Sequence, residues 1–100
     1  MDREMDVATR ARLIEWLKTE LVDQQSRLFK AMWDGSSARV TDSLSGLIAS
    51  SYILGRRLGI SYRELDAAIA GKLEKLRQEG HQLEDTYQDL SSLSEHIRKR

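Results

Sequence analysis

Proline and cysteine are both absent from this chain of 100 residues, and aromatic side chains make up only 6% of it. Without cysteine the chain can form neither a disulfide framework nor a thiolate metal site. The absence of proline, together with abundant Leu, Ala, Glu, Lys and Arg, favours a chain built from helices. We therefore expect an all-α protein.

A net charge and a long apolar run are missing as well. Sixteen basic residues balance sixteen acidic ones, so no net field draws the chain towards nucleic acid or an anionic membrane. No apolar run approaches the roughly 20 residues that cross a bilayer, and the charged residues 1–6 are unlike a signal peptide. We expect a soluble, cytoplasmic protein whose residues 1–6 are disordered, with neither membrane nor nucleic acid as a partner.

Apolar residues recur at helical spacing along almost the whole chain. The spacing predicts helices over residues 7–33, 39–58, 62–79 and 83–97, and a break in the last one near residues 89–92 stays open. Four helices joined by short loops predict an up-and-down bundle or two packed helical hairpins. We expect them to form one domain over residues 1–100.

The turns between the predicted helices carry recognisable signals. Gly35 follows the first helix, and glycine tolerates the left-handed conformation that is common just past a helix end. Ser61 and Glu64 have the spacing of a capping box, in which each side chain satisfies a backbone donor at a helix start. These signals support helix boundaries near residues 34 and 61.

The size of the chain and its apolar surface predict self-association. A chain of this length buries only about 60–70% of its unfolded surface, so a second copy would help to complete the core. Trp16, Val22 and Phe29 lie off the main apolar stripe of the first helix and would stay exposed in a monomer. We expect a homodimer or a higher homo-oligomer.

The run from Leu44 to Ser61 resembles the second helix of the MazG-like family, which belongs to the all-α nucleotide pyrophosphohydrolases. Its most family-like part is Tyr52 to Ser61, and a second family-like run spans residues 87–91. The resemblance covers residues 14–93. Within the family, the chain is most similar in these runs to a branch of small, stand-alone proteins. The resemblance implies a four-helix, MazG-like bundle completed by oligomerisation, with a site at a helix interface and a nucleotide as ligand.

Active members of this family hold magnesium with a Glu-Glu-x-x-Glu motif on one helix and a Glu-x-x-Asp pair on the next. The matching positions here are Asp23, Gln24, Arg27, Ser43 and Gly46, so one carboxylate remains. Magnesium is held by carboxylate, water and phosphate oxygens, and Arg27 would place a positive charge where the metal belongs. The spacing of Asp23 and Arg27 instead favours an ordinary ion pair between successive helical turns.

Two alternative interpretations concern the same helices. Ser43, Gly46 and Ser50 form a stripe of small residues, which would allow another helix to approach to about 8 Å. A rebuilt magnesium site could also combine Asp23 with Glu20, one turn away, and Asp42. Both interpretations stay open at the level of sequence.

Basic residues on the third helix are the candidates for phosphate binding. Lys72, Lys75 and Arg77 lie in a stretch where, by the resemblance, family members place Lys and Arg against substrate phosphates. A solvated helix face explains the same charges more simply. The basic tail at residues 95–100 is typical of a helix end that complements the helix dipole.

Three functions remain open. The replacement of four of the five expected acids favours a catalytically degenerate pyrophosphohydrolase scaffold that acts in assembly or nucleotide sensing and needs no cofactor. The first alternative is an active, magnesium-dependent nucleoside triphosphate pyrophosphohydrolase with relocated carboxylates. The second is a structural helical adaptor.

Overall fold

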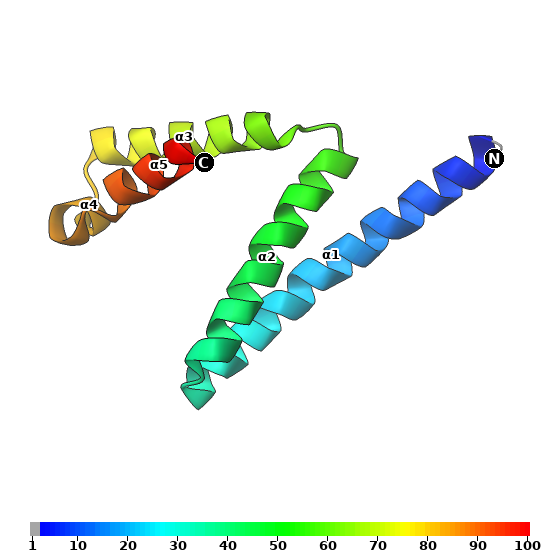
Figure 1. The fold of residues 1–100 in the computed structure, drawn as a ribbon, viewed down its shortest axis with the longest axis horizontal. Coiled ribbons are helices and arrows are strands. Elements are labelled where there is room, and N and C mark those ends of the chain that lie inside the picture. Colours follow the sequence, from blue (N-terminus) through cyan, green and yellow to red (C-terminus); the bar gives the residue numbers. More distant parts are fainter. Residues whose placement is uncertain (1–2) are drawn as a thin grey trace. The chain divides into compact units, whose positions relative to one another are not determined.

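The computed structural model describes the backbone of residues 3–100 and the side chains from Asp6 onwards (Figure 1). This part of the chain is all-α, as predicted, and contains no strand. Its helices are α1 (Arg3–Asp34), α2 (Ser37–Arg57), α3 (Tyr62–Glu79), α4 (Gln82–Tyr87) and α5 (Asp89–Lys99). Within residues 3–100, none of the helices has the length and apolar composition needed to span a bilayer.

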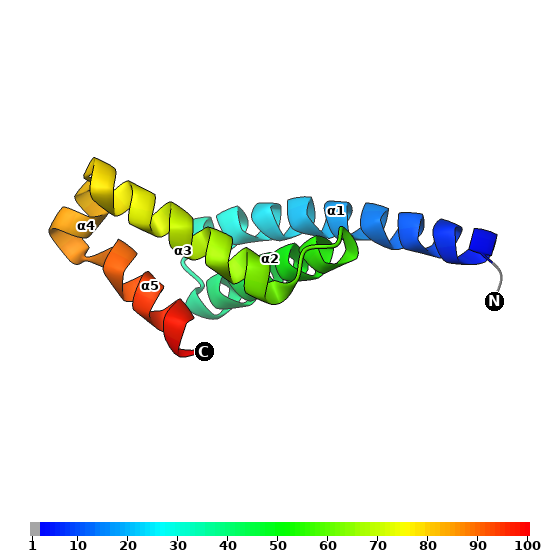
Figure 2. The ribbon, with the colours of Figure 1, turned by 90° about the horizontal axis from the view of Figure 1, so that it is seen from above.

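The helices belong to two compact units, Met1–Ile60 and Ser61–Arg100. In the first unit, α1 and α2 form a hairpin in which the second half of α1 lies beside α2 (Figure 1 and Figure 2). The turn depends on Gly35, whose positive φ of 69° suits a residue without a Cβ. Ser36 then caps α2, because its Oγ accepts a hydrogen bond from the Arg39 N–H at 3.3 Å.

The two helices of the hairpin meet through small residues. Ser43 and Ser50 on α2 are buried, and Gly46 lies directly against the side chain of Gln24 on α1. Leu17 and Ala31 are the buried apolar residues that α1 contributes. The predicted small-residue stripe therefore serves close helix packing.

Large apolar side chains remain exposed on the same hairpin. Trp33 is 91% exposed, Val22 69%, Phe29 64% and Trp16 58%. The buried apolar surface of the hairpin is correspondingly small. This agrees with the prediction that Trp16, Val22 and Phe29 lie outside the core of a single chain.

The second unit is closed by contacts of α5 with α3 and α4. Its buried apolar residues are Leu73 on α3 and Leu90 on α5. The serine half of the predicted capping box is confirmed, because the Oγ of Ser61 accepts from the Glu64 N–H at 3.1 Å. The Glu64 carboxylate accepts from the Ser61 hydroxyl at 3.2 Å, a bond between the two side chains.

The break that the sequence left open in the last helix is present, one residue before the expected range of 89–92. Gln88 adopts a left-handed conformation with φ 58° and ends α4 before α5 begins. Of the residues expected to be disordered, 1 and 2 lie outside the described residues, and the helix α1 begins at Arg3; disorder of residues 1–6 stays a prediction. The four-helix bundle and the single domain over residues 1–100 stay predictions.

Candidate functional site

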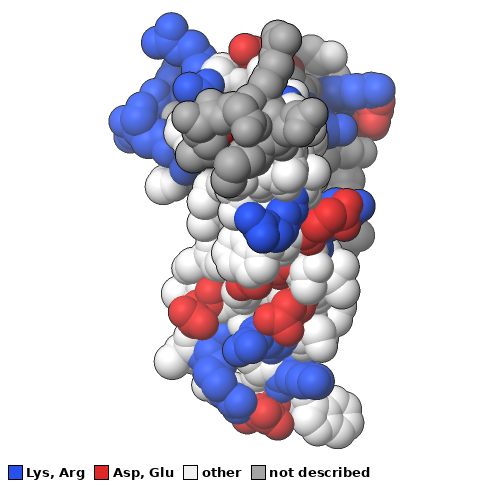
Figure 3. Space-filling view, turned by 90° about the vertical axis from the view of Figure 1, so that its right-hand side faces the viewer, with Lys and Arg blue, Asp and Glu red and all other residues white. Residues whose placement is uncertain are grey.

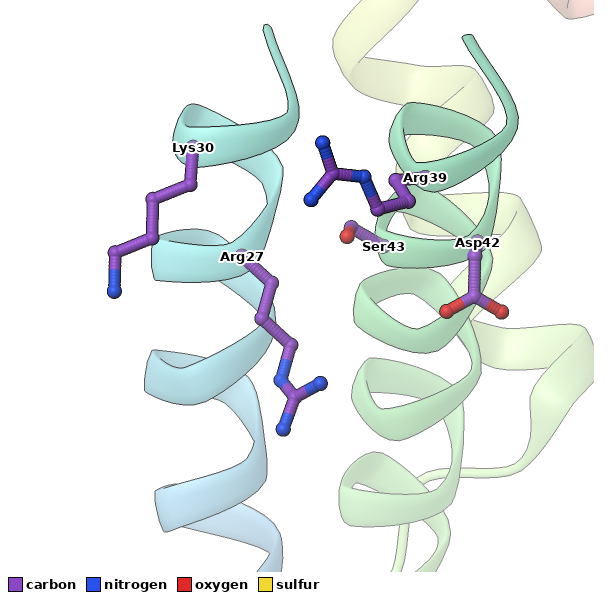
Figure 4. Close-up of a pocket in the computed structure, with 5 residues that line it drawn as sticks. All are labelled: Arg27, Lys30, Arg39, Asp42 and Ser43. Atoms are coloured by element: carbon purple, nitrogen blue, oxygen red, sulfur yellow. The ribbon is translucent and has the colours of Figure 1, made fainter. Parts of the chain in front are cut away.

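The hairpin gathers the five positions that match the metal ligands of the family. Asp23, Gln24 and Arg27 lie on successive turns in the second half of α1, and Ser43 and Gly46 lie on α2. Gln24 touches Gly46, while Arg27 and Ser43 border the same cavity between the helices (Figure 4). The hairpin thus brings together the positions that the resemblance matched to metal ligands, and what they can bind depends on the side chains present.

An amide occupies one part of this location. A Cβ added to Gly46 would lie 2.6 Å from Cδ of Gln24, so the amide group fills the space that glycine leaves. Gln24 Nε2 donates a hydrogen bond to Glu20 Oε1 at 3.1 Å. The Oε1 atom of Gln24 is buried and has no hydrogen-bond partner among the described residues. A neutral amide therefore packs where the family places a carboxylate.

The guanidinium group of Arg27 lies at another of the five matched positions. Arg27 Nε donates to Asp23 Oδ2 at 2.8 Å, which confirms the predicted ion pair. The hydrogen bond to Asp23 and then the charge of Asp23 raise the pKa of Arg27, and the charges of Glu20 and Asp42 add to this against an opposing effect of burial. The three acids proposed as metal ligands thus all stabilise one protonated guanidinium.

The residues at this location do not fit a magnesium ion. Magnesium requires oxygen ligands in near-octahedral geometry, whereas Asp23 is paired with Arg27 and the neighbouring position carries the amide of Gln24. Across the described side chains, no group of three or more His, Asp or Glu residues is placed to hold a metal ion. A rebuilt site of Glu20, Asp23 and Asp42 would have to displace Arg27, and it stays a prediction.

A cavity of about 170 Å³ lies beside the guanidinium of Arg27, between α1 and α2. Its lining is formed by Arg27, Lys30, Arg39, Asp42 and Ser43 (Figure 4). Sequence analysis missed Lys30 and Arg39 as site residues. The three-residue spacing of Arg27 and Lys30 and the four-residue spacing of Arg39 and Ser43, each on one helical face, were the signals that could have indicated them.

The predicted phosphate-binding residues lie in the second unit, on α3. Lys72 is exposed, and Lys75 Nζ is 4.0 Å from a carboxylate oxygen of Glu79. Arg77 pairs with Glu74 at 2.7 Å and with Glu84 on α4 at 3.3 Å. Phosphate binding by these three residues stays a prediction, although Arg77 already has a structural role.

Glu84 joins the helices of the second unit. Its carboxylate accepts hydrogen bonds from the Ser91 hydroxyl and from the Ser91 N–H, the latter at 3.0 Å, and it pairs with Arg77. The hydroxyl of Ser91, followed by its N–H and the charge of Arg77, holds the pKa of Glu84 below its usual range. This interaction connects α3, α4 and α5 through one side chain.

The charges of the molecule are otherwise mixed. On the face shown in Figure 3, basic and acidic side chains lie interspersed among uncharged ones. This distribution matches the balance of sixteen basic and sixteen acidic residues in the sequence.

The family of the chain is shown by comparison with models of known protein families. A model of the MazG-like family matches residues 7–90, which is most of the chain. The chain therefore belongs to the MazG-like family, and the predicted resemblance is confirmed. No curated protein and no solved structure gives a significant match to it.

Proposed function

We propose that this chain is a non-hydrolysing member of the MazG-like family that acts in assembly or nucleotide sensing. The observation that carries the proposal is the position of Arg27. Its guanidinium is held by Asp23 at 2.8 Å, and it also experiences the charges of Glu20 and Asp42. A permanent cation of the protein thus takes up the negative charge that a metal ion would need.

The chemistry of the family explains why this replacement matters. Pyrophosphohydrolysis by its active members relies on a metal ion that activates a water molecule, and a carboxylate cage must hold that ion. Here four of the five cage positions carry an amide, a guanidinium, a hydroxyl and a hydrogen atom as side chains. A guanidinium binds anions but does not supply an activated water, because it stays protonated.

The assembly role is supported by the apolar surface of the hairpin. Trp33, Val22 and Phe29 expose area that a second copy could cover, and two hairpins together would form a four-helix bundle. We expect a homodimer or a higher oligomer in solution. Sedimentation as a monomer of 11.5 kDa would contradict this part of the proposal.

A pyrophosphate-release assay tests the proposed lack of hydrolysis. Ribo- and deoxynucleoside triphosphates are incubated with the protein at high concentration in the presence of Mg²⁺ or Mn²⁺. We expect no release above background. A rate that falls in the Asp23→Asn variant but not in Glu15→Gln, whose carboxylate pairs with Lys18 at 3.0 Å on the same helix, would show an active enzyme instead.

One observation favours the active alternative. Glu20, Asp23 and Asp42 all act on the charge of Arg27. The described side chains include no group of three acids placed to hold a metal ion, so the active alternative requires Arg27 to swing outwards and these carboxylates to regroup. In that case replacing the three acids by their amides should abolish turnover, and unchanged rates would exclude the rebuilt site.

A further inference from the structure

We propose that the cavity between α1 and α2 binds a phosphate group without a metal ion, through Lys30, Arg39 and the hydroxyl of Ser43. The inference deepens the proposed sensing role and rests on it. Three basic residues and one acidic residue, Asp42, line the cavity, and the Lys30 side chain extends away from α2 in this structure (Figure 4). Its chemistry is therefore that of an anion site bordered by a single carboxylate.

Ser43 presents a hydroxyl group to the cavity. Ser43 is only 3% exposed, and its hydroxyl has no hydrogen-bond partner among the residues that the structure describes. Elsewhere on α2, the hydroxyls of Thr41, Ser45 and Ser51 each donate to the carbonyl oxygen four residues earlier. The Ser43 hydroxyl makes no such bond and borders the cavity, on the side of α2 that faces α1 (Figure 4). The Ser43 oxygen is not among the fully buried, unpartnered side-chain atoms of the described residues, so it is open to the cavity and can donate to a phosphate oxygen there.

The basic side chains of the cavity are available to an anion. Arg39 pairs with Asp34 at 2.9 Å, but the two side chains are 61% and 47% exposed. An ion pair this exposed contributes little, so a phosphate that carries more charge can compete with Asp34 for the guanidinium. Lys30 is exposed and has a flexible stem, so its ammonium can turn towards a bound anion. Arg27 contributes less, because Asp23 already neutralises it.

The size of the cavity defines the ligand. Pockets that enclose a drug-sized molecule measure about 300–1,000 Å³, whereas this one measures about 170 Å³. It accommodates a phosphate or pyrophosphate group, and a nucleoside attached to that group would lie outside. Free phosphates and the phosphates of a nucleotide share the chemistry that the cavity recognises.

Calorimetric titration of the whole chain in the presence of EDTA tests the proposal. Inorganic phosphate, pyrophosphate and ATP are titrated separately, and the ligands then compete with one another. We expect saturable binding of pyrophosphate and ATP at one shared site. Tighter binding of ATP would identify a nucleotide as the source of the phosphate, and equal affinities would identify the phosphate group alone. No saturable binding in EDTA, or binding only after magnesium is added, would overturn the proposal.

Matched variants assign the binding to this cavity. We expect Lys30→Gln and Arg39→Gln each to weaken binding about tenfold, and Ser43→Ala to weaken it less. Asp42→Asn should tighten binding about threefold, because it removes the one carboxylate of the lining. A misfolded variant cannot give that gain. Lys18→Gln, on α1 but outside the cavity, is the control, and an equal loss of affinity in Lys18→Gln and Arg39→Gln would contradict the assignment.

The titration and the hydrolysis assay test the two proposals independently, so either proposal can be contradicted while the other stands. Absence of metal-free binding would remove the cavity as a phosphate site and leave a non-hydrolysing scaffold in place. Magnesium-dependent turnover would contradict the proposed function even if the cavity binds phosphate.

Discussion

The hairpin of α1 and α2 and the unit of α3, α4 and α5 hold their helices together in different ways. In the hairpin, Gly46 and two buried serines bring the helices close, and large apolar side chains such as Trp33 remain exposed. In the second unit, Glu84 joins Arg77 to Ser91, and Arg100 on the tail pairs with Asp66 on α3 at 3.1 Å.

This difference in packing indicates which of the two units needs a further surface to cover its apolar side chains. Polar links that reach from one helix to another allow the second unit to close on itself. Polar links also join the helices of the hairpin, from Arg10 to the carbonyl oxygen of Arg57 at 2.8 Å and from Arg39 to Asp34 at 2.9 Å. Both are exposed, and the hairpin leaves apolar area for a further surface to cover. The candidate site lies on the hairpin, in the unit that we expect a second copy to complete.

The largest effect should come from the small apolar core. Leu17 in the hairpin is 4% exposed and Leu90 in the second unit is 5% exposed. Leu17→Ala and Leu90→Ala should each lower the free energy of unfolding by about 2–5 kcal/mol, because a buried side chain is replaced by a cavity. Amide hydrogen exchange should rise first in α1 and α2 for Leu17→Ala and in α3 to α5 for Leu90→Ala. Identical exchange patterns in the two variants would contradict the division into two units.

A smaller, pH-dependent loss of stability should show the contribution of the Glu84 carboxylate, which links α3, α4 and α5. The pKa of Glu84 is lowered in the folded protein, so its stabilisation is present above the ordinary carboxylate pKa and is lost as the pH falls through the lowered value. Urea unfolding at neutral pH should therefore show Glu84→Gln to be less stable than the wild type. The difference should shrink as the solution is acidified below the ordinary carboxylate pKa. A difference that does not change with pH would show that the charge of Glu84 is not the cause, and Glu15→Gln serves as the exposed control.

The smallest change in stability is expected when one glycine in each unit is replaced by alanine. Gly71 on α3 has no atom near the position of an added Cβ, whereas Gly46 has Gln24 at 2.6 Å. Gly71→Ala should stabilise the chain by about 0.5–1 kcal/mol through helix propensity. Gly46→Ala should gain less, since the amide of Gln24 has to move. Thermal unfolding of both variants measures the cost of that displacement, and an equal gain in both would show that Gln24 moves freely.

Features set by local sequence were predictable here. Helical periodicity located α1, α2 and α3, Ser61 caps α3 as expected, and the four-residue spacing of Asp23 and Arg27 predicted their ion pair. The break at Gln88 was placed one residue or more too late, because a left-handed glutamine carries no strong turn signal.

The candidate site was only partly predictable. The resemblance located Arg27 and Ser43, but the cavity also depends on Lys30 and Arg39, which come together only when the hairpin closes. The unpartnered hydroxyl of Ser43 was equally invisible in the sequence, since Thr41 and Ser45 on the same helix donate to the backbone. Hydrogen-bond satisfaction is a property of the packed structure.

The most direct test of the account is a measurement of Mn²⁺ binding to the wild type and to Arg27→Glu, by electron paramagnetic resonance of the free ion. The account holds that the Arg27 guanidinium, 2.8 Å from Asp23, takes the place of the metal. It predicts no saturable binding by the wild type and a gain of binding in Arg27→Glu, which exchanges the cation for a carboxylate ligand. Saturable binding of one Mn²⁺ per wild-type chain, lost in Asp23→Asn, would contradict it.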